Sequence, residues 1–306
     1  MSITYRIGTR DSQLALWQAT RIQHLLKKSG INTVLVPVKS EGDLDLTTPL
    51  YAMGVQGIFT RSLDQALLNN QIDLAVHSMK DVPVQLPKGI VEAAVPERDN
   101  PYDLLAPRQQ LENTFLEDHR PALIGSSSLR RRSQWLHRFP QDSIAPIRGN
   151  VNTRLKKLAE SNWSGAIFAA AGLERIGLRP QNAIELSWML PAPAQGALLV
   201  VCRENDEPLL SSCAKLHDER TAFCAHIERD FLSALMGGCS TPVGALAEIE
   251  NEELLFQGNL TSTDGKKQVT IEKRISLELA ASLGTSAARE LLEEGGMAIL
   301  KEIKHA

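Results

Sequence analysis

Strand and helix patterns alternate twice along the chain, and this alternation limits the possible folds more than any other feature. The first round has strand patterns at 3–8, 33–38 and 72–79, separated by helix patterns at 12–30 and 58–70. A helix between two strands can return the chain to the same edge of a sheet, so this order favours a mostly parallel sheet. We therefore expect an α/β unit in the N-terminal part of the chain.

A second round of the same kind follows. Strand patterns at 121–125, 143–148 and 165–170 alternate with helix patterns at 126–139 and 150–161. This repetition predicts a second, separate α/β unit with its own mostly parallel sheet.

Two proline-rich segments, 82–107 and 190–201, separate the two rounds and close the second one. Because prolines interrupt regular elements, we expect the chain to cross between two lobes at these segments, with a cleft between the lobes. The expected first lobe is residues 1–97 with a returning segment at 197–215, and the expected second lobe is 102–191.

The pattern changes in the last third of the chain, from about residue 219. A long helix pattern at 220–235 is followed by three strand patterns and a final helix pattern at 286–303. The strand patterns lie at 243–250, 254–260 and 268–275. This order predicts a small α+β domain, 219–306, with a three-stranded antiparallel sheet.

The composition is that of an ordinary globular protein, with 43% hydrophobic residues, 23% charged residues and a net charge of −3 among 306 residues. No apolar run reaches the roughly 18 residues of a transmembrane helix. The N-terminus lacks the basic, apolar and small-residue order of a signal peptide. We expect a cytoplasmic protein that does not enter a membrane.

Cys239 stands on a turn, in the stretch GGCSTPVG, where two glycines precede it and Pro242 follows. Four cysteines without a CxxC pair make disulfides or a zinc ribbon improbable. Cys213, Cys224 and the neighbouring histidines predict no metal site, because Cys224 and His226 would point to different sides of a helix. The residues alone leave open whether Cys239 attacks a substrate or holds a group.

Three strand patterns end in polar clusters that contain arginine. These residues are Arg10 and Ser12; Ser127, Ser128, Arg130 and Arg131; and Arg148 and Arg154. Helix N-termini and arginine forks both favour carboxylates and phosphates, so we expect a cleft for a polyanionic small molecule. Nucleic acid is a weaker candidate, because aromatic residues are only 5% of the chain and would supply few stacking platforms.

The stretch AVHSMKDVP ends another strand pattern and carries Ser78, Lys80 and Asp81. Lys80 could form a Schiff base and His77 could act as a general base, or Lys80 and Asp81 could form a solvated turn. An acid in a basic cleft is well placed to stabilise a cationic reaction centre. This combination suits a substrate with anionic arms on which a cation forms.

Short motifs follow one another along nearly the whole chain: GTRDSQLALWQA, SEGD, AVHSMKDVP, GSSSLRR, RGNVNTRL, AAAGLERIGL, PAQGAL, ERDFL and GGCSTPVG. In this order they resemble the porphobilinogen deaminase family, also called hydroxymethylbilane synthases. The resemblance implies two periplasmic-binding-protein-like lobes with mixed, mostly parallel sheets, plus a C-terminal α+β domain. It also implies a monomer.

The resemblance implies a transferase of haem and tetrapyrrole biosynthesis. Such enzymes join four porphobilinogen molecules into linear hydroxymethylbilane and release ammonia at each step. The chain grows from a dipyrromethane cofactor, which a thioether would attach here to Cys239. Asp81 would be the catalytic acid, which hydrogen-bonds pyrrole nitrogens and stabilises the azafulvene cation.

The resemblance also implies which residues hold the many carboxylates of cofactor and substrate. The implied cofactor-binding residues, besides Cys239, are Arg10, Ser12, Asp43, Lys80, Ser127, Ser128, Arg130, Arg131, Arg148, Gln195 and Gly196. The implied substrate-binding residues are Arg10, Ser78, Arg148, Arg154 and Arg175.

The chain departs from the family pattern at a few positions. Ala52 and Gln56 replace two lysines of a glycine-rich loop, Ala194 replaces a glycine before Gln195, and Tyr102 replaces an arginine. The lost cations suggest a slower or less processive enzyme. They also motivate the alternative of a catalytically impaired or non-catalytic anion-binding protein on the same scaffold.

Overall fold

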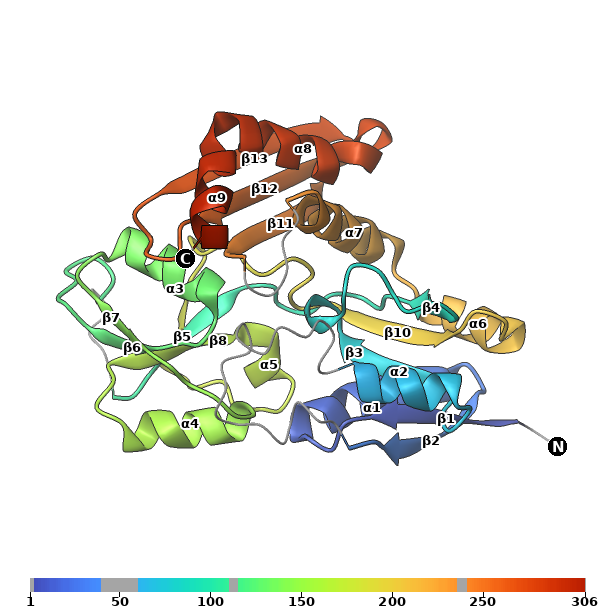
Figure 1. The fold of residues 1–306 in the computed structure, drawn as a ribbon. Coiled ribbons are helices and arrows are strands. Elements are labelled where there is room, and N and C mark those ends of the chain that lie inside the picture. The colour runs from blue at the N-terminus through green and yellow to red at the C-terminus, as the bar shows by residue number, and fades with distance from the viewer. Residues whose placement is uncertain (1–2, 40–59, 110–114, 236–240, 306) are drawn as a thin grey trace.

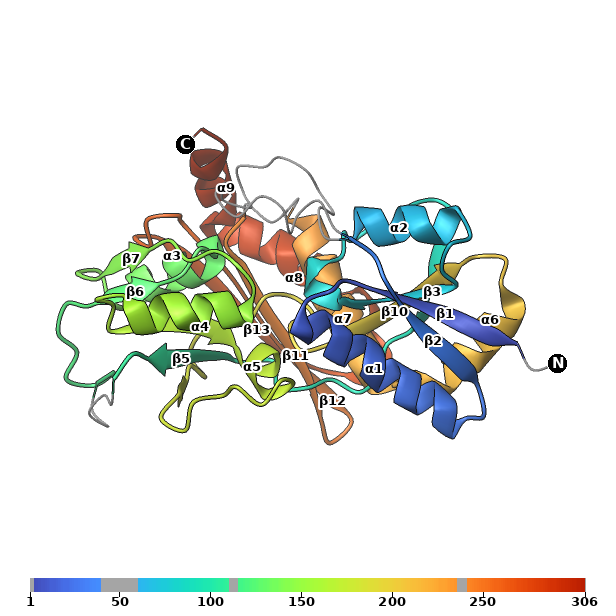
Figure 2. The same cartoon turned by 90° about the horizontal axis from the view of Figure 1, so that it is seen from below.

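The computed structural model describes residues 3–39, 60–109, 115–235 and 241–305. It contains three sheets, two of five strands and one of three. Figure 1 shows the first and second sheets in two lobes side by side, with the third sheet above both. Figure 2 shows the two lobes from below. No described helix is both long and apolar enough to cross a bilayer.

The first sheet has the strand order β2-β1-β3-β10-β4. Its strands are β1 (Thr4–Thr9), β2 (Asn32–Pro37), β3 (Leu74–Ser78), β4 (Ile90–Ala94) and β10 (Leu198–Arg203), and its helices are α1 (Gln13–Lys28), α2 (Arg61–Leu68) and α6 (Glu207–Cys213). Both faces are covered: Leu198 and Val200 of β10 pack in a cluster with α1, whereas Leu199 and Val201 pack with α2. The strand β10 is therefore buried on both sides, at the centre of the lobe.

The second sheet has the order β7-β6-β8-β5-β9. Its strands are β5 (Asp103–Pro107), β6 (Leu123–Gly125), β7 (Ser143–Ala145), β8 (Gly165–Ala169) and β9 (Ile184–Glu185), and its helices are α3 (Leu129–Arg138), α4 (Val151–Glu160) and α5 (Ala170–Glu174). Clusters around Phe168 and around Trp135 cover its two faces. The expected α/β class with mostly parallel sheets is confirmed, because β1, β2 and β3 run parallel and so do β6, β7 and β8.

Two strands were missed in the proline-rich segment 82–107, which was expected only to cross between the lobes. It contains β4 of the first sheet and β5 of the second, separated by the crossing itself. The strand β5 runs antiparallel to both neighbours, and so does β10, which follows the return crossing. Short strands bounded by prolines give little sequence signal, because pairing partners far along the chain select them.

The two crossings touch. The amide of Asp99 donates to the carbonyl of Gly196 at 3.2 Å. Gly196 has φ +89°, and a Cβ there would lie 2.5 Å from the carbonyl oxygen of Asp99. Only glycine permits this close approach of two chain segments.

The third sheet, β11-β12-β13, is antiparallel as expected. It comprises β11 (Val243–Glu250), β12 (Glu253–Thr261) and β13 (Gln268–Ser276), with the helices α7 (Glu219–Ala234), α8 (Leu283–Leu291) and α9 (Met297–His305). Phe231 of α7 packs on Phe256, with ring centroids 5.1 Å apart, and lies where a Cβ on Gly258 would collide with its ring. The helix α7 is thereby fixed against the sheet.

The single final helix expected at 286–303 is wrong. The structure has α8 and α9, joined by a π-helical turn, Leu292–Gly296. Gly295 lies inside that turn at φ +119°, a conformation outside the helical region. The apolar periodicity continued across the break, so the pattern alone predicted one helix.

Candidate active site

The polar clusters lie where parallel strands end and helices begin, as the sequence predicted. Ser12 caps α1, Ser128 caps α3 and Asn150 caps α4, each accepting from an amide three residues later. These caps satisfy amide groups that a helix end leaves without partners. The caps set the directions of the helices that carry the arginines.

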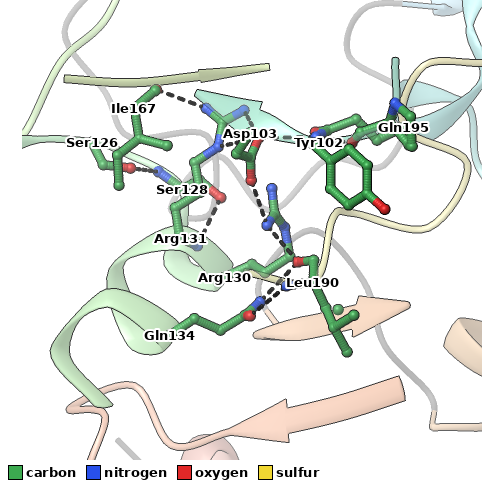
Figure 3. Close-up of polar contacts among 12 residues, drawn as sticks. Tyr102, Asp103, Ser126, Ser128, Arg130, Arg131, Gln134, Ile167, Leu190 and Gln195 are labelled. Atoms are coloured by element: carbon green, nitrogen blue, oxygen red, sulfur yellow. Dashed lines mark hydrogen bonds and ion pairs between the residues drawn. The ribbon is translucent and has the colours of Figure 1, made fainter. Parts of the chain in front are cut away.

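Arg130 and Arg131 of α3 converge on a single carboxylate, Asp103 at the start of β5 (Figure 3). Asp103 Oδ1 accepts from Arg131 Nε at 3.1 Å and Nη2 at 2.7 Å, and its Oδ2 pairs with Arg130 Nη1 at 2.8 Å. Asp103 is fully buried. Burial alone would raise its pKa, but the two guanidinium groups hold the pKa of Asp103 well below its ordinary value.

Main-chain carbonyls take further donors of the two arginines. Arg131 Nη1 donates to the carbonyl of Ile167 at 3.0 Å, and Arg130 Nη1 donates to that of Leu190 at 2.8 Å. The pair is thus fixed in direction, and part of its charge is balanced within the protein. Sequence reasoning had expected both arginines to meet ligand carboxylates and had not singled out Asp103.

Gln195 extends this network to the first lobe. Its Nε2 donates to Asp103 Oδ1 at 2.9 Å and to the carbonyl of Pro101 at 2.7 Å. Its Oε1 accepts from Lys80 Nζ at 3.1 Å. Burial lowers the pKa of Lys80 to about 8, because its ammonium has lost most of its water. A continuous polar chain therefore joins Lys80 of one lobe to the arginine pair of the other.

Asp81 lies next to Lys80 on a 3₁₀ turn after β3 and is exposed. It faces cations of the second lobe: the pKa of Arg154 is lowered to about 10 by burial and by Arg131 and Arg148, whereas Asp81 opposes that shift. An accessible carboxylate thus lies among cations from two lobes. An acid among cations is suited to a cationic reaction centre, and this role of Asp81 stays a prediction.

Four predicted serines use their hydroxyls within the protein. Ser127 Oγ accepts from the amide of Ile147 at 2.8 Å, and Ser78 Oγ accepts from Gln18 Nε2 at 2.8 Å. Ser12 and Ser128 cap helices. A hydroxyl that accepts such a bond still has its own proton to donate, so these serines can also meet a carboxylate.

His77 is the penultimate residue of β3 and is buried, with Arg10 near enough to affect it. Burial, together with the charge of Arg10, lowers the pKa of His77 to about 4. The imidazole is therefore neutral near neutral pH, and its Nε2 has no hydrogen-bond partner among the described residues. A group with so low a pKa is a weak base, which disfavours the general-base role considered for it.

Arg175 lies apart from the cluster, at the crossing between the lobes. Its Nε donates to Asp99 Oδ2 at 2.7 Å, and its Nη2 donates to the carbonyl of Gly196 at 2.7 Å. Asp99 also pairs with Arg21 of α1 at 2.6 Å. The structure thus gives Arg175 partners at the crossing, with Gly196 providing the close contact there.

Two predicted site residues, Asp43 and Cys239, lie outside the described residues, as do Ala52 and Gln56. The other three cysteines are buried free thiols. Among the described residues no group of three or more histidine, cysteine, aspartate or glutamate side chains could hold a metal ion.

A second buried carboxylate, Glu228 of α7, was also missed by sequence reasoning. It is fully buried and accepts from Arg98 at 2.6 and 3.0 Å and from the amides of Ala194 and Ala247 at 2.6 and 2.8 Å. It therefore joins the crossing segments to β11 of the third sheet. Asp103 offered one signal, a charge at the start of the apolar stretch DLLAP, whereas Glu228 stands beside Arg229 and Asp230 and offered none.

Comparison with known proteins adds the decisive observation. A family model described as "porphobilinogen deaminase, dipyromethane cofactor binding domain" matches residues 5–211, and one described as "porphobilinogen deaminase, C-terminal domain" matches 222–293. The chain belongs to the porphobilinogen deaminase family. The resemblance expected from the ordered motifs is thereby confirmed.

Curated relatives of this family match almost end to end. The porphobilinogen deaminase of Syntrophotalea carbinolica is 41% identical over 303 residues, which cover 98% of this chain and 96% of that protein. That of Syntrophomonas wolfei is 38% identical and covers 98% of both chains. A solved periplasmic substrate-binding protein of an ABC transporter from Coxiella burnetii is 15% identical, with a TM-score of 0.43 over 71% of this chain and 94% of that one.

Proposed function

We propose that this chain is a transferase that joins four porphobilinogen molecules head to tail into hydroxymethylbilane and releases ammonia. Membership of the porphobilinogen deaminase family supports this function over the non-catalytic alternative, which nothing in the family match favours. The observation that carries the proposal is the accessible Asp81 among Lys80, Arg131 and Arg154.

In this proposal Asp81 is the catalytic acid. Loss of ammonia leaves positive charge on the substrate methylene and pyrrole ring, and a nearby carboxylate stabilises that charge as it develops. The surrounding cations bind the acetate and propionate arms, so substrate charge and protein charge alternate in space. Lys80, with a pKa of about 8, can take up or release a proton close to Asp81.

We propose that the carboxylate-binding groups are the arginines of the strand ends. Arg154 of the second lobe lies close enough to interact both with Arg148 and with Asp81 of the first lobe. Arg130 and Arg131 keep N–H groups beyond those that Asp103 and the two carbonyls accept, and these groups can meet a ligand. Arg10, Ser12, Ser78, Ser127, Ser128, Asp43, Gln195, Gly196 and Arg175 complete the proposed set.

A dipyrromethane cofactor fits this donor set. Its carboxylates match a site rich in guanidinium groups, and the matched family model is a cofactor-binding domain. When bound, the cofactor supplies the pyrrole carbon from which the product chain grows. We propose Cys239 as its thioether anchor, because two glycines beside the thiol leave room for a bulky substituent.

We also propose the division into three domains, 1–97 with 197–215, 102–191 and 219–306. Strand pairing supports it, since β10 completes the first sheet and β5 to β9 make the second. A monomeric state in the cytoplasm, with no nucleic-acid partner, completes the proposal.

Intact-mass spectrometry tests the anchor. The purified chain, or the chain incubated with porphobilinogen, is expected to carry the added mass of two linked pyrroles. Cys239→Ala is expected to lose that mass, with Cys213→Ala as the control that keeps it. A bare polypeptide that porphobilinogen cannot load would refute the cofactor proposal.

Steady-state release of ammonia tests the acid. Asp81→Asn removes the charge while keeping the shape, and turnover is expected to fall by a factor of roughly 100 or more. Cofactor mass, measured on the same sample, reports whether the site is still assembled. Unchanged turnover in a loaded Asp81→Asn protein would remove Asp81 from its assigned role.

A further inference from the structure

Arg229 of α7 holds the main chain around Asp81. Its Nη1 donates to the carbonyls of Met79 at 3.0 Å and Val82 at 2.9 Å, and its Nη2 donates to the carbonyl of Pro83 at 2.6 Å. The helix belongs to the third domain, whereas the three carbonyls belong to the first lobe. One side chain therefore spans two parts of the molecule to reach a single short loop.

Burying the Arg229 guanidinium costs folding free energy, which points to a specific use of its contacts with the loop. Arg229 is 7% exposed, and it has no salt bridge to a carboxylate within the described part of the chain. Burial lowers the pKa of Arg229, against the weaker opposing effects of Glu92 and Asp230. A buried guanidinium that donates to three main-chain carbonyls contributes less to stability than an apolar side chain of similar size. It does fix the positions of the carbonyls that it contacts.

These carbonyls flank the proposed catalytic acid on both sides. Met79 precedes Lys80 and Asp81, and Val82 and Pro83 follow them. Met79 is held a second time, because its amide donates to the carbonyl of Ala197 at 3.0 Å. The loop ends are thus fixed while the Asp81 side chain stays exposed, which is what a group that must reach a substrate requires.

We propose that Arg229 is a positioning residue for Asp81: it holds the acid at the reacting carbon by fixing the peptide units on either side. This proposal rests on the proposed function of Asp81. Because Cys239 follows α7 closely in the sequence, the helix that holds the acid also precedes the segment that carries the proposed anchor. Glu228, the preceding residue, ties this helix to the crossing through Arg98.

Substitution of Arg229 separates positioning from binding. Arg229→Gln cannot reach all three carbonyls, so kcat is expected to fall by a factor of roughly 10 to 100, while KM for porphobilinogen changes by less than about threefold. Arg229→Lys keeps the charge but lacks the planar fork of the guanidinium. Its kcat is expected to lie between that of Arg229→Gln and that of the parent chain. Arg220→Gln, at an exposed position of the same helix, is the matched control and is expected to keep the parent kcat.

Two further measurements distinguish positioning from general loss of structure. Cofactor mass gives the fraction of assembled sites, to which kcat is normalised, and amide hydrogen exchange at Val82 is expected to speed up in Arg229→Gln but not in Arg220→Gln. An unchanged kcat per loaded site in Arg229→Gln would overturn the proposal. So would a loss of rate that is accounted for by unloaded protein alone.

The double variant Asp81→Asn/Arg229→Gln tests whether the two residues act together. If Arg229 acts through Asp81, the double variant is expected to be about as slow as Asp81→Asn alone. If instead the losses of kcat in the two single variants multiply in the double variant, the positioning proposal is overturned, whereas Asp81 keeps its role. If Asp81→Asn alone keeps full turnover, the proposed function of Asp81 fails instead.

Discussion

Ala194 lies in the left-handed region of the backbone, at φ +61°, although it has a Cβ. The position is fully buried, and the Ala194 amide donates to Glu228 at 2.6 Å. The strain of about 1 kcal/mol is thus held in place by a buried carboxylate. The sequence had shown this alanine where the family motif has glycine, and the structure explains why glycine is the easier residue.

Ala194→Gly is expected to stabilise the protein by about 1 kcal/mol, because glycine adopts a positive φ without a steric penalty. The measurement is the midpoint of thermal or urea unfolding. Gly196→Ala, two residues later, is the control, and it is expected to lower the unfolding midpoint because its Cβ would collide with the Asp99 carbonyl. A lower midpoint for Ala194→Gly would show that the left-handed conformation is not strained.

At the scale of elements, α7 contacts the first lobe through an ion pair as well as through Arg229. His226 Nε2 lies 3.0 Å from Glu92 Oε2 of β4. The hydrogen bond to Glu92 raises the pKa of His226 above its ordinary value. The charged imidazole therefore favours the docked helix.

Because the folded pKa of His226 is raised, its stabilisation is full below the unfolded pKa of about 6.5 and is lost as pH rises through the folded pKa. Its side chain is 49% exposed, so the effect is expected to stay below about 1 kcal/mol. The check is the unfolding midpoint of the parent chain and of His226→Gln from pH 5.5 to 8.5. The two curves are expected to converge at high pH, and a constant gap would contradict the assignment.

At the scale of the whole molecule, Asp99 fastens the two lobes at the crossing. One carboxylate oxygen pairs with Arg21 of the first lobe, and the other accepts from Arg175 of the second. Both arginines also lie near the ring of Trp17, at 5.7 and 5.8 Å from its centroid. The lobes thus share one acid and one aromatic ring.

Asp99→Asn is expected to weaken this connection by roughly 2 kcal/mol, because two charge-assisted hydrogen bonds lose their charge. Amide hydrogen exchange in the crossing segments is expected to speed up, with exchange in the third domain unchanged. Asp118→Asn, at an exposed position of the second lobe, serves as control. Equal exchange in Asp99→Asn and the parent chain would indicate that other contacts fasten the lobes.

Sequence reasoning predicted most of the fold and only part of the site. The helix caps at Ser12, Ser128 and Asn150 were predictable, because their signals are local. The strands β4 and β5 were not, since partners distant in sequence select them. Distance along the chain separated the caps from the missed strands, whereas the break at Gly295 was missed although it is local, because the apolar pattern continues across it.

The same distinction applies to the site. Asp81 and the arginines were proposed as site residues because they follow strand ends, a local pattern. Asp103 and Glu228 were missed, because only the folded chain brings them to Arg130, Arg131 and Arg98. The expected role of Arg130 and Arg131 in holding ligand carboxylates stays a prediction, and their ion pairs with Asp103 were not foreseen.

The position of β10 has a consequence for how the protein is made. In the order β2-β1-β3-β10-β4, β3 and β4 do not pair with each other, and the strand that joins them comes from residues 198–203. During synthesis the ribosome releases the whole second lobe before this strand emerges. Until then the nascent first lobe keeps open edges on β3 and β4, which can pair with other chains. These two strands of the first lobe are therefore protected only when β10, which is made much later, pairs with them.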